Sequence, residues 1–201
     1  MSMFSLFCVT NRALCTEPFF ARLEKLSHAP LQGIILREKD LTPSAYATYA
    51  DRAAKICAGK VPLILHNFPA AAEHLHLPLQ LPMSVFLSLT PQQRQAFSLG
   101  VSVHSVEEAK TAEDLGVRWL LAGHIYATSC KPGVAPRGLA FLAQVCNAVS
   151  VPVYAIGGMT IDHLPEVQKA GAQGCCVMSA WMTCPDPKEE IAAWASAAAA
   201  L

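Results

Sequence analysis

Short apolar runs alternate along the chain with longer stretches in which apolar residues recur at helical spacing. The short runs are rich in β-branched residues and predict eight strands, at 4–10, 33–39, 61–67, 76–81, 100–104, 119–126, 151–158 and 174–180. The helix-like stretches that separate most of them are 19–27, 43–59, 105–116, 137–150, 160–172 and 186–201. Strands that are apolar on both faces, with helices between them, indicate a parallel sheet covered by helices.

The number of strands relative to the chain length indicates the fold class. Eight strands in 201 residues leave about 25 residues for each strand–helix unit. This predicts an α/β protein with a single (βα)8 TIM barrel of minimal length, formed by residues 1–201 as one domain. A doubly wound open sheet is the main alternative, although it normally uses fewer strands and a glycine-rich turn after the first one. The third and fourth units are the weakest, since one helix is short and Pro91 interrupts the other.

Composition excludes several classes of protein. Apolar residues make up 53% of the chain and charged residues 15%, so extensive disorder is not expected. Fifteen basic and fifteen acidic residues give no net charge, which predicts no nucleic-acid partner and no anionic membrane partner. No apolar run approaches ~18 residues, and the first residues do not resemble a signal peptide. The eight cysteines form no CxxC pair and are interpreted as buried thiols in a cytoplasmic protein. So low a fraction of charge favours burial of further surface in a homodimer.

Polar residues follow the apolar part of six of the eight expected strands. In a parallel barrel these carboxyl ends meet at one mouth, where barrel enzymes carry out their chemistry. Residues two apart face the same way, so Arg37 pairs with Lys39 and Ser102 pairs with His104. The polar strand endings, in chain order, are Arg37 and Lys39, His66 and Asn67, Ser102 and His104, His124, Gly157 and Gly158, and Ser179.

Each ending also has a purely structural interpretation. The charged residues 37–40 could form a solvated strand exit, and His104 could serve only to start the helix that follows it. His124 could be a structural histidine after an apolar run. The histidines at positions 66, 74 and 76 could be taken for metal ligands, but no carboxylate or cysteine lies at a suitable spacing, and no metal site is predicted.

The last two strands carry features of a phosphate site. Glycines allow the backbone to approach a ligand closely, and N–H groups at a following helix start can bind a phosphate. Barrel enzymes often bind phosphate after strands seven and eight. Gly157, Gly158, Ser179 and Ala180 are therefore the predicted phosphate-binding residues, and the predicted partner is a phosphorylated small molecule.

Several motifs together resemble a known family. The segments CVTNR, ILREKD, GVSVHSVEEAKTAEDLG, LAGHIYATSCKPG, PVYAIGGM and CVMSAW resemble, in order and spacing, the thiamine-phosphate synthase superfamily. Within it they most resemble the TenI-like thiazole tautomerases. The resemblance extends from Phe7 to about Pro187 and is weakest between Phe68 and Leu99. It implies a (βα)8 barrel that acts on a thiazole phosphate in thiamine biosynthesis, usually in the bacterial cytoplasm.

The resemblance implies two enzymatic activities that the sequence distinguishes. The synthase of this superfamily joins a pyrimidine pyrophosphate to the thiazole phosphate and holds magnesium on aspartates after the third and fourth strands. Here the third strand ends at His66-Asn67, and HLPLQLPMS contains no acidic residue. Magnesium requires oxygen ligands, so its binding is expected only if the synthase alternative holds. The synthase also usually carries proline where this chain has His124, so the histidine favours the tautomerase. No cofactor is expected for the tautomerase.

The tautomerase resemblance implies a role for each site residue. His124 is expected to move the proton, and His104 is expected to be a second acid/base or a positioning group. Arg37 and Lys131 are expected to hold the substrate carboxylate, with Lys39, Asn67 and Ser102 as further substrate-binding residues. At the end of the third strand, either His66 or Asn67 could replace the residues that the family has there. A binding or regulatory protein that holds thiazole phosphate without catalysis is a third interpretation.

Overall fold

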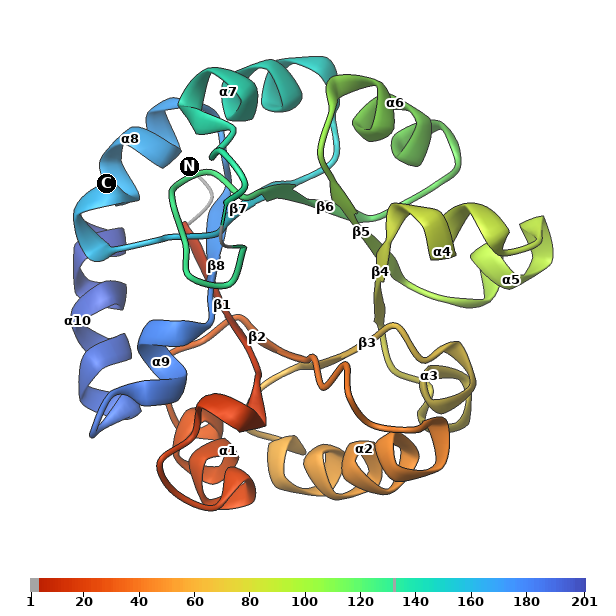
Figure 1. The fold of residues 1–201 in the computed structure, drawn as a ribbon, viewed down its shortest axis with the longest axis vertical. Helices are drawn as coiled ribbons and strands as arrows, with labels where there is room; N and C mark the ends of the chain where they lie inside the picture. The colour runs from red at the N-terminus through yellow and green to blue at the C-terminus, as the bar shows by residue number, and fades with distance from the viewer. Residues whose placement is uncertain (1–3, 132) are drawn as a thin grey trace.

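The computed structural model describes residues 4–131 and 133–201, and it shows a closed barrel of eight parallel strands (Figure 1). Strand β1 pairs with β2 on one side and with β8 on the other, and this closes the sheet. The doubly wound alternative is therefore wrong, and the predicted single (βα)8 barrel is confirmed. The strands are β1 (Ser5–Val9), β2 (Gly33–Leu36), β3 (Leu63–His66), β4 (Leu79–Pro82), β5 (Leu99–Val103), β6 (Trp119–Gly123), β7 (Val153–Ile156) and β8 (Gly174–Val177).

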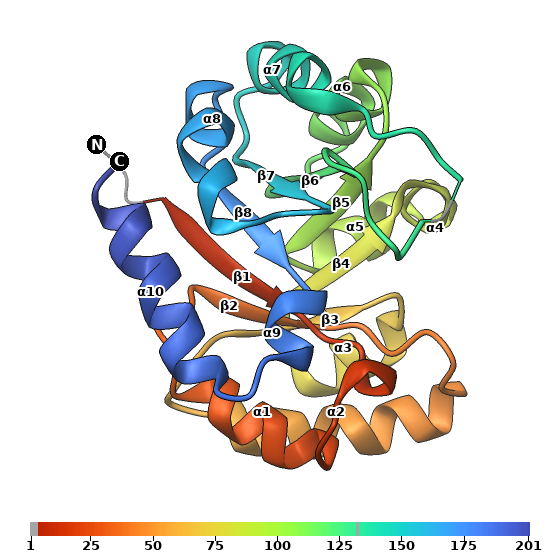
Figure 2. The same ribbon diagram turned by 60° about the vertical axis from the view of Figure 1, so that its left-hand side comes forward.

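Helices surround the barrel on its outer face, as Figures 1 and 2 show. Pro91 divides the fourth helical segment in two, because Thr90 accepts a hydrogen bond from Gln93 N and starts a new helix there. The α-helices are α1 (Phe19–Ser27), α2 (Pro43–Cys57), α3 (Pro69–Leu75), α4 (Met83–Ser88), α5 (Pro91–Ala96), α6 (Val106–Asp114), α7 (Gly138–Ala148), α8 (Leu164–Lys169), α9 (Ser179–Thr183) and α10 (Pro187–Ala199). Two 3-10 helices complete the set, η1 (Arg12–Leu14) and η2 (Ile161–His163).

The limits of all eight expected strands differ somewhat from the observed ones, and three of the strands show how. The fourth begins at Leu79, because His76 adopts a left-handed conformation (φ 53°) that ends α3. The sixth ends at Gly123 rather than at residue 126, and the eighth ends at Val177, after which Ser179 begins α9. In the last two cases the chain leaves the sheet earlier than its apolar pattern indicates, since apolar side chains also line the loops at the mouth.

The apolar residues form two separate clusters. The larger one lies between strands and helices and includes fully buried Tyr46, whose hydroxyl donates to Leu36 O (2.6 Å) and accepts from His66 N (2.9 Å). The smaller one fills the inside of the barrel and consists of Val9, Ile35, Ile64, Leu121 and Cys176. This division places odd and even residues of each strand in different clusters, as the period of a strand requires.

All eight cysteines are free thiols, and four of them are buried. The prediction of buried thiols is thus confirmed for four of them, three are half-buried, and Cys130 is exposed in the loop after β6. Among the described residues, no helix has the length and apolar character needed to cross a membrane.

Candidate active site

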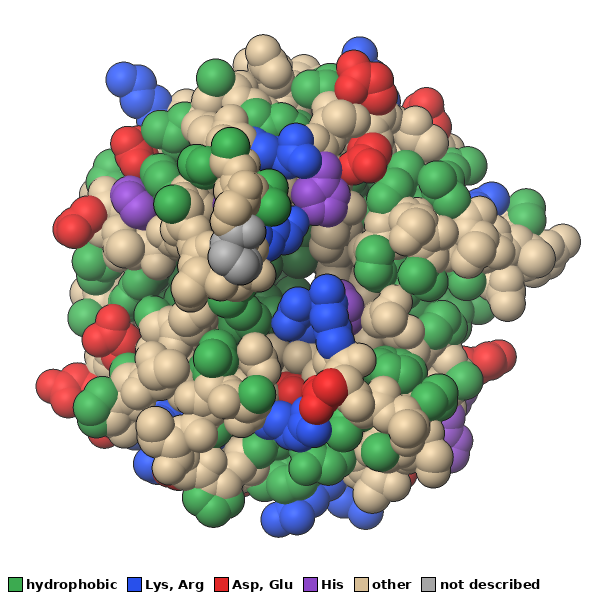
Figure 3. All heavy atoms as spheres, viewed as in Figure 1, with side chains coloured by type: hydrophobic (Ala, Val, Ile, Leu, Met, Phe, Trp, Pro, Cys, Tyr) green, Lys and Arg blue, Asp and Glu red, His purple; other side chains and the backbone are tan. Residues whose placement is uncertain are grey.

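A cavity of about 550 Å³ opens at the carboxyl ends of the strands. Figure 3 shows the opening near the centre of the face, with basic and histidine side chains around it. Residues from seven of the strands, and from the segment that follows β2, converge there, although they are far apart in the sequence. The predicted site residues that line the cavity are Arg37, Lys39, Ser102, His104, His124, Lys131, Gly157, Gly158, Ser179 and Ala180.

Asn67 is the predicted site residue that the structure does not bring to the cavity. Its backbone is left-handed (φ 67°), and its Oδ1 is buried without a hydrogen-bond partner among the described residues. The preceding residue, His66, lines the cavity instead. Of the two neighbours at the end of β3, His66 therefore lines the cavity and Asn67 does not, and a substrate contact at this position stays a prediction.

The imidazole of His66 is almost completely buried, with an exposed fraction of 7%. Burial, together with the nearby charges of Arg37 and Lys39, lowers the pKa of His66 to about 3. At neutral pH this side chain is therefore an uncharged donor and acceptor next to two cations.

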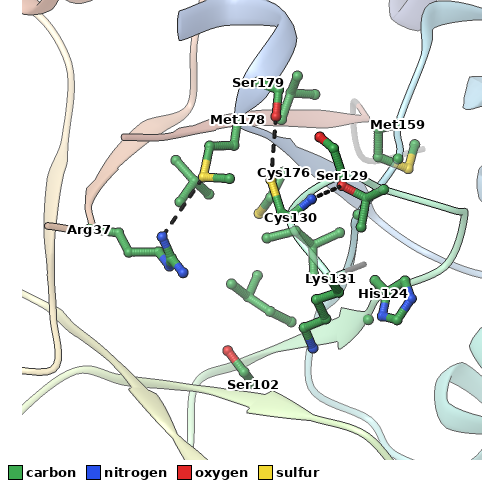
Figure 4. Close-up of a pocket in the computed structure, with 18 of the residues that line it drawn as sticks. Arg37, Ser102, His124, Ser129, Cys130, Lys131, Met159, Cys176, Met178 and Ser179 are labelled. Carbon is green, nitrogen blue, oxygen red and sulfur yellow. Dashed lines mark hydrogen bonds between the residues drawn. The ribbon is translucent and has the colours of Figure 1, made fainter. Parts of the chain in front are cut away.

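Three cations face the cavity: Arg37, Lys39 and Lys131. Burial lowers the pKa of Arg37, and the charge of Arg37 lowers the pKa of Lys39, with further lowering from burial and from Lys131. Like charges disfavour one another's charged forms, so a cluster of this kind is stabilised when an anion enters it. In Figure 4 the side chains of Arg37 and Lys131 both reach toward the open space.

Arg37 is held in place by a buried network around Glu38. The Glu38 carboxylate accepts from Thr10 Oγ1 (2.7 Å) and from the backbone N–H of Arg12 (2.9 Å), and the same Thr10 Oγ1 accepts from Arg37 N (3.0 Å). Arg12 also forms a two-point ion pair with Asp40. A simple solvated strand exit does not describe this segment, because Glu38 is 1% exposed and Arg37 faces the cavity.

His104 follows β5, whereas Arg37 follows β2. Its Nε2 is 3.4 Å from Lys131 Nζ, and its Nδ1 is 3.6 Å from a Glu108 carboxylate oxygen. Burial and Lys131 lower the pKa of His104, and Glu108 partly opposes them. Ser105, not His104, starts α6, since its hydroxyl accepts from Glu108 N (3.0 Å). The imidazole of His104 is therefore available to a ligand.

His124 follows the last residue of β6 and is 5% exposed, yet it lines the cavity. Its Nε2 lies 3.3 Å from the carbonyl oxygen of Val134, in the loop that leads to α7. A carbonyl oxygen only accepts, so Nε2 carries the proton of the neutral ring and Nδ1 keeps the lone pair. This fixes one nitrogen of His124 as the basic one.

The double glycine after β7 is required by the close approach of two loops. Both residues have positive φ, 101° at Gly157 and 65° at Gly158. A Cβ at Gly157 would lie 2.3 Å from His124 Cβ, and a Cβ at Gly158 would lie 2.4 Å from Ala127 O. The glycines thus bring the turn after β7 against the loop that carries His124.

The predicted phosphate-binding residues follow two neighbouring strands. Gly157 and Gly158 follow β7, and Ser179 and Ala180 follow its partner β8 and form the first turn of α9. The thiol of Cys130 is 3.5 Å from Ser179 Oγ, and Figure 4 shows this contact at the upper side of the cavity. Backbone N–H groups and hydroxyls of this kind suit a phosphate dianion.

The cavity walls do not fit a magnesium ion. Among the described residues that line the cavity, none is an aspartate or a glutamate. The position after β3 is Asn67 and the strand β4 ends at Pro82, where the synthase would need its aspartates. Magnesium prefers carboxylate oxygens, and the nearby Glu38 carboxylate already accepts from Thr10 and from Arg12.

The fold and the cavity together define a (βα)8 barrel protein with a small-molecule site at the carboxyl ends of its strands. The chain belongs to the family described as thiamine monophosphate synthase, whose family model matches residues 6–181. This confirms the predicted superfamily and places the chain in a family of thiamine-biosynthesis enzymes.

Named relatives share the full length of the barrel. The putative thiamine-phosphate synthase 2 of Aquifex aeolicus (strain VF5) is 32% identical over 189 residues, which cover 90% of this chain and 100% of the relative. Thiamine-phosphate synthase 2 of Streptococcus pneumoniae serotype 4 is 31% identical, with 90% and 89% of the two chains covered. The names of these relatives indicate a transferase rather than an isomerase.

A solved structure confirms the fold independently. The thiamine phosphate pyrophosphorylase from Pyrococcus furiosus superposes with a TM-score of 0.83 over 98% of this chain and 96% of that one. Its sequence identity is 24%, so the comparison shows the shared barrel only.

Several cavity residues were not among the predicted site residues. Most of them lie in the strands themselves, and the largest other group lies in the loop after β6. The signal that could have found them is the two-residue period of the inward face. The additional residues are Val9, His66, Pro82, Leu121, Gly123, Ala127, Thr128, Ser129, Cys130, Ile156, Met159, Thr160, Cys176, Val177 and Met178.

Proposed function

We propose that this protein catalyses an aromatising proton shift in a carboxythiazole phosphate, as a thiazole tautomerase. One observation carries the proposal: the imidazole of His124 and three cations share a cavity whose described walls contain no carboxylate. Such a cavity suits a substrate with two anionic groups and a reaction that needs an acid and a base, but not one that needs a divalent metal.

The chemistry is a balanced transfer of one proton. A proton leaves the ring carbon that bears the carboxylate, and a proton is added at the exocyclic carbon, so the double bond moves into the ring. Aromatisation of the ring provides the driving force. The neutral Nδ1 of His124 accepts the first proton, and the resulting imidazolium donates the second, which is feasible near neutral pH.

The remaining residues bind the two anionic ends of the substrate. Arg37 offers a planar fork to the carboxylate, supported by Lys131, while Lys39 adds positive charge at the same side. The amides of the double glycine and the first turn of α9 receive the phosphate. His104, whose Nε2 lies 3.4 Å from Lys131 Nζ, serves as a second acid/base or positions that lysine.

A solvent-exchange assay tests this function. The wild-type protein should convert the exocyclic carboxythiazole phosphate to its aromatic tautomer in deuterated water and place deuterium at the exocyclic carbon. His124→Gln should lose about 10²–10⁴ of that rate, which is the usual contribution of positioned acid–base catalysis, and it should still bind the aromatic product. His74→Gln, an exposed histidine on α3, is the matched control. Full activity in His124→Gln would assign the proton transfer to another group.

The synthase is the second candidate, because the named relatives are thiamine-phosphate synthases. The cations Arg37, Lys39 and Lys131 could also receive a pyrophosphate. Magnesium-dependent coupling of a pyrimidine pyrophosphate to thiazole phosphate, with no deuterium incorporation, would establish this alternative. Binding of thiazole phosphate without either reaction would instead identify a non-catalytic binding protein.

A further inference from the structure

A hydrogen-bonded chain of three side chains crosses the inside of the barrel below the cavity. Trp119 Nε1 donates to Gln80 Oε1 (2.8 Å), and Gln80 Nε2 donates to Ser102 Oγ (3.1 Å). Gln80 is fully buried, on β4, and does not line the cavity, whereas Ser102 does. These are polar groups in a barrel interior otherwise filled mainly by hydrocarbon.

The direction of this chain is determined at its lower end. An indole N–H can only donate, so the amide atom that faces Trp119 must be the oxygen of Gln80. The amide nitrogen then faces Ser102, and Ser102 Oγ receives a hydrogen bond from it. Because one lone pair of the hydroxyl is occupied in this way, its O–H is directed away from Gln80 and remains free to donate.

A glycine provides the space for this arrangement. A Cβ at Gly100 would lie 2.0 Å from Trp119 Nε1 and 2.4 Å from Gln80 Oε1. Gly100 is paired with Trp119 across β5 and β6, so the indole crosses directly over it. The Trp119–Gln80 hydrogen bond therefore requires a residue without a side chain at position 100.

We propose that Trp119 and Gln80 are positioning residues that orient the hydroxyl of Ser102 as a donor to the substrate carboxylate. This inference rests on the proposed function, which supplies the carboxylate. Ser102 lies on β5, on a different side of the cavity from the phosphate residues after β8, and Figure 4 shows it below Arg37 and Lys131 with Ser179 at the far side. In this proposal Ser102 and Arg37 both donate hydrogen bonds to the carboxylate end of the ligand. Together they select ligands that carry a hydrogen-bond acceptor at that end.

Binding measurements with two probes test the proposal. The aromatic carboxythiazole phosphate contains the carboxylate, and thiazole phosphate lacks it. Ser102→Ala should weaken binding of the first probe about tenfold, as expected for a lost hydrogen bond to a charged group, and should leave binding of the second nearly unchanged. Gln80→Met, which keeps the side-chain volume but removes both hydrogen bonds of the amide group, should show the same selective loss.

A double variant separates orientation from general structural damage. Because Gln80 acts through Ser102, the Gln80→Met/Ser102→Ala protein should bind the carboxythiazole phosphate no more weakly than Ser102→Ala alone. Gln32→Met is the matched control, since Gln32 accepts from Leu6 N (2.6 Å) far from the cavity. Trp119→Phe is the second route if Gln80→Met does not fold, and it should show a smaller loss in the same direction.

A spectroscopic measurement tests the chain without turnover. The protein has three tryptophans, and Trp119→Phe assigns the indole N–H signal of Trp119 in a ¹H–¹⁵N spectrum. That signal should move in Gln80→Met and in Ser102→Ala, and it should move again when the carboxythiazole phosphate is added to the wild type. It should not move in Gln32→Met.

The outcomes distinguish this inference from the proposed function. If the wild type binds the carboxythiazole phosphate and Gln80→Met binds it equally well, or if the two substitutions are additive, the positioning role is wrong. If the wild type binds neither probe, the proposed function fails. An indole signal that is unaffected by Ser102→Ala would show that Trp119, Gln80 and Ser102 do not act as one hydrogen-bonded chain.

Discussion

The two ends of the barrel are built from the same strands and have opposite character. At the amino-terminal end a small cavity of about 180 Å³ is lined by apolar and aromatic side chains, among them Phe7, Ile64 and Tyr154. At the carboxyl end the larger cavity has three cations and three imidazoles in its walls. On β3, Ile64 lines the apolar cavity, and His66, the next residue with the same orientation, lines the polar one.

This difference shows how the barrel separates stability from chemistry. The lower layer is lined by hydrocarbon, and shortening one of its side chains costs folding free energy. The upper layer carries cations and imidazoles at or after the ends of the strands, where they can bind and react. Substitutions at the two ends should therefore have different consequences, and the expected effects below test this separation.

Of the substitutions that compare the two ends, the one with the largest expected effect is at the contact between the double glycine and His124. Gly157→Ala places a Cβ within 2.3 Å of His124 Cβ and should reduce kcat/KM for tautomerisation by about 10²-fold, because the imidazole must move. Gly59→Ala is the control, since Gly59 also has positive φ (71°) but no atom within 4 Å of the added Cβ. Steady-state kinetics that show equal losses in both variants would mean that backbone strain alone is responsible.

Arg37→Gln should reduce affinity for the carboxythiazole phosphate by about 10- to 100-fold, as for the loss of one partner of a charged hydrogen bond. Arg52→Gln is the matched control, because Arg52 lies on the outer helix α2 over the ring of Phe20. Isothermal titration calorimetry measures both variants. An Arg37→Gln protein with wild-type affinity would remove Arg37 from the site.

At the other end of the barrel, Ile64→Ala should lower the free energy of unfolding by about 2–4 kcal/mol, since it enlarges an existing cavity. The KM of the folded variant should stay close to that of the wild type. Urea denaturation and kinetics on the same preparation measure the two quantities. A large change in KM would show that the lower layer and the site are coupled.

The smallest expected effect is a pH dependence from His66. Its pKa is about 3 in the folded protein and about 6.5 when unfolded, so between these values the unfolded chain binds more protons. The contribution of His66 to stability is complete above pH 6.5 and is lost as the pH falls toward 3. His66→Asn should therefore reduce the slope of unfolding free energy against pH in this window by at most about 1.4 kcal/mol per unit.

Urea denaturation at several pH values measures this slope for the wild type and for His66→Asn. His74→Asn, an exposed substitution on α3, gives the reference for removal of an imidazole. An unchanged slope in His66→Asn would show that His66 is protonated in the folded protein.

The fold was largely predictable because its signal is local and repeated. Each apolar run that was expected to be a strand contains one, and Ser105 and Pro187 begin helices as their residue types indicate. The limits of the strands were less predictable. His76 was expected inside the fourth strand, but its left-handed backbone depends on the turn into β4, which local apolarity does not describe.

The candidate site was predictable only in part. Polar residues at strand ends identified the predicted part of the cavity wall, but they did not decide between His66 and Asn67, and only His66 lines the cavity. Gln80 carried no local signal, because a single amide between leucines looks like any buried polar residue. Its partners Trp119 and Ser102 lie 39 and 22 residues away, and only the pairing of β4, β5 and β6 brings them together.

The sequence by itself determined the order of the elements, the class of the fold and the family, since these depend on periodicity and on motifs within continuous segments. The tertiary structure decided which member of each strand-end pair faces the cavity, which carboxylates are already hydrogen-bonded, and which polar groups meet inside the barrel. The physical reason is that alternation along a strand defines two faces but not which one is inside. Closure of β1 on β8 and the exact residue at which each strand ends make that choice.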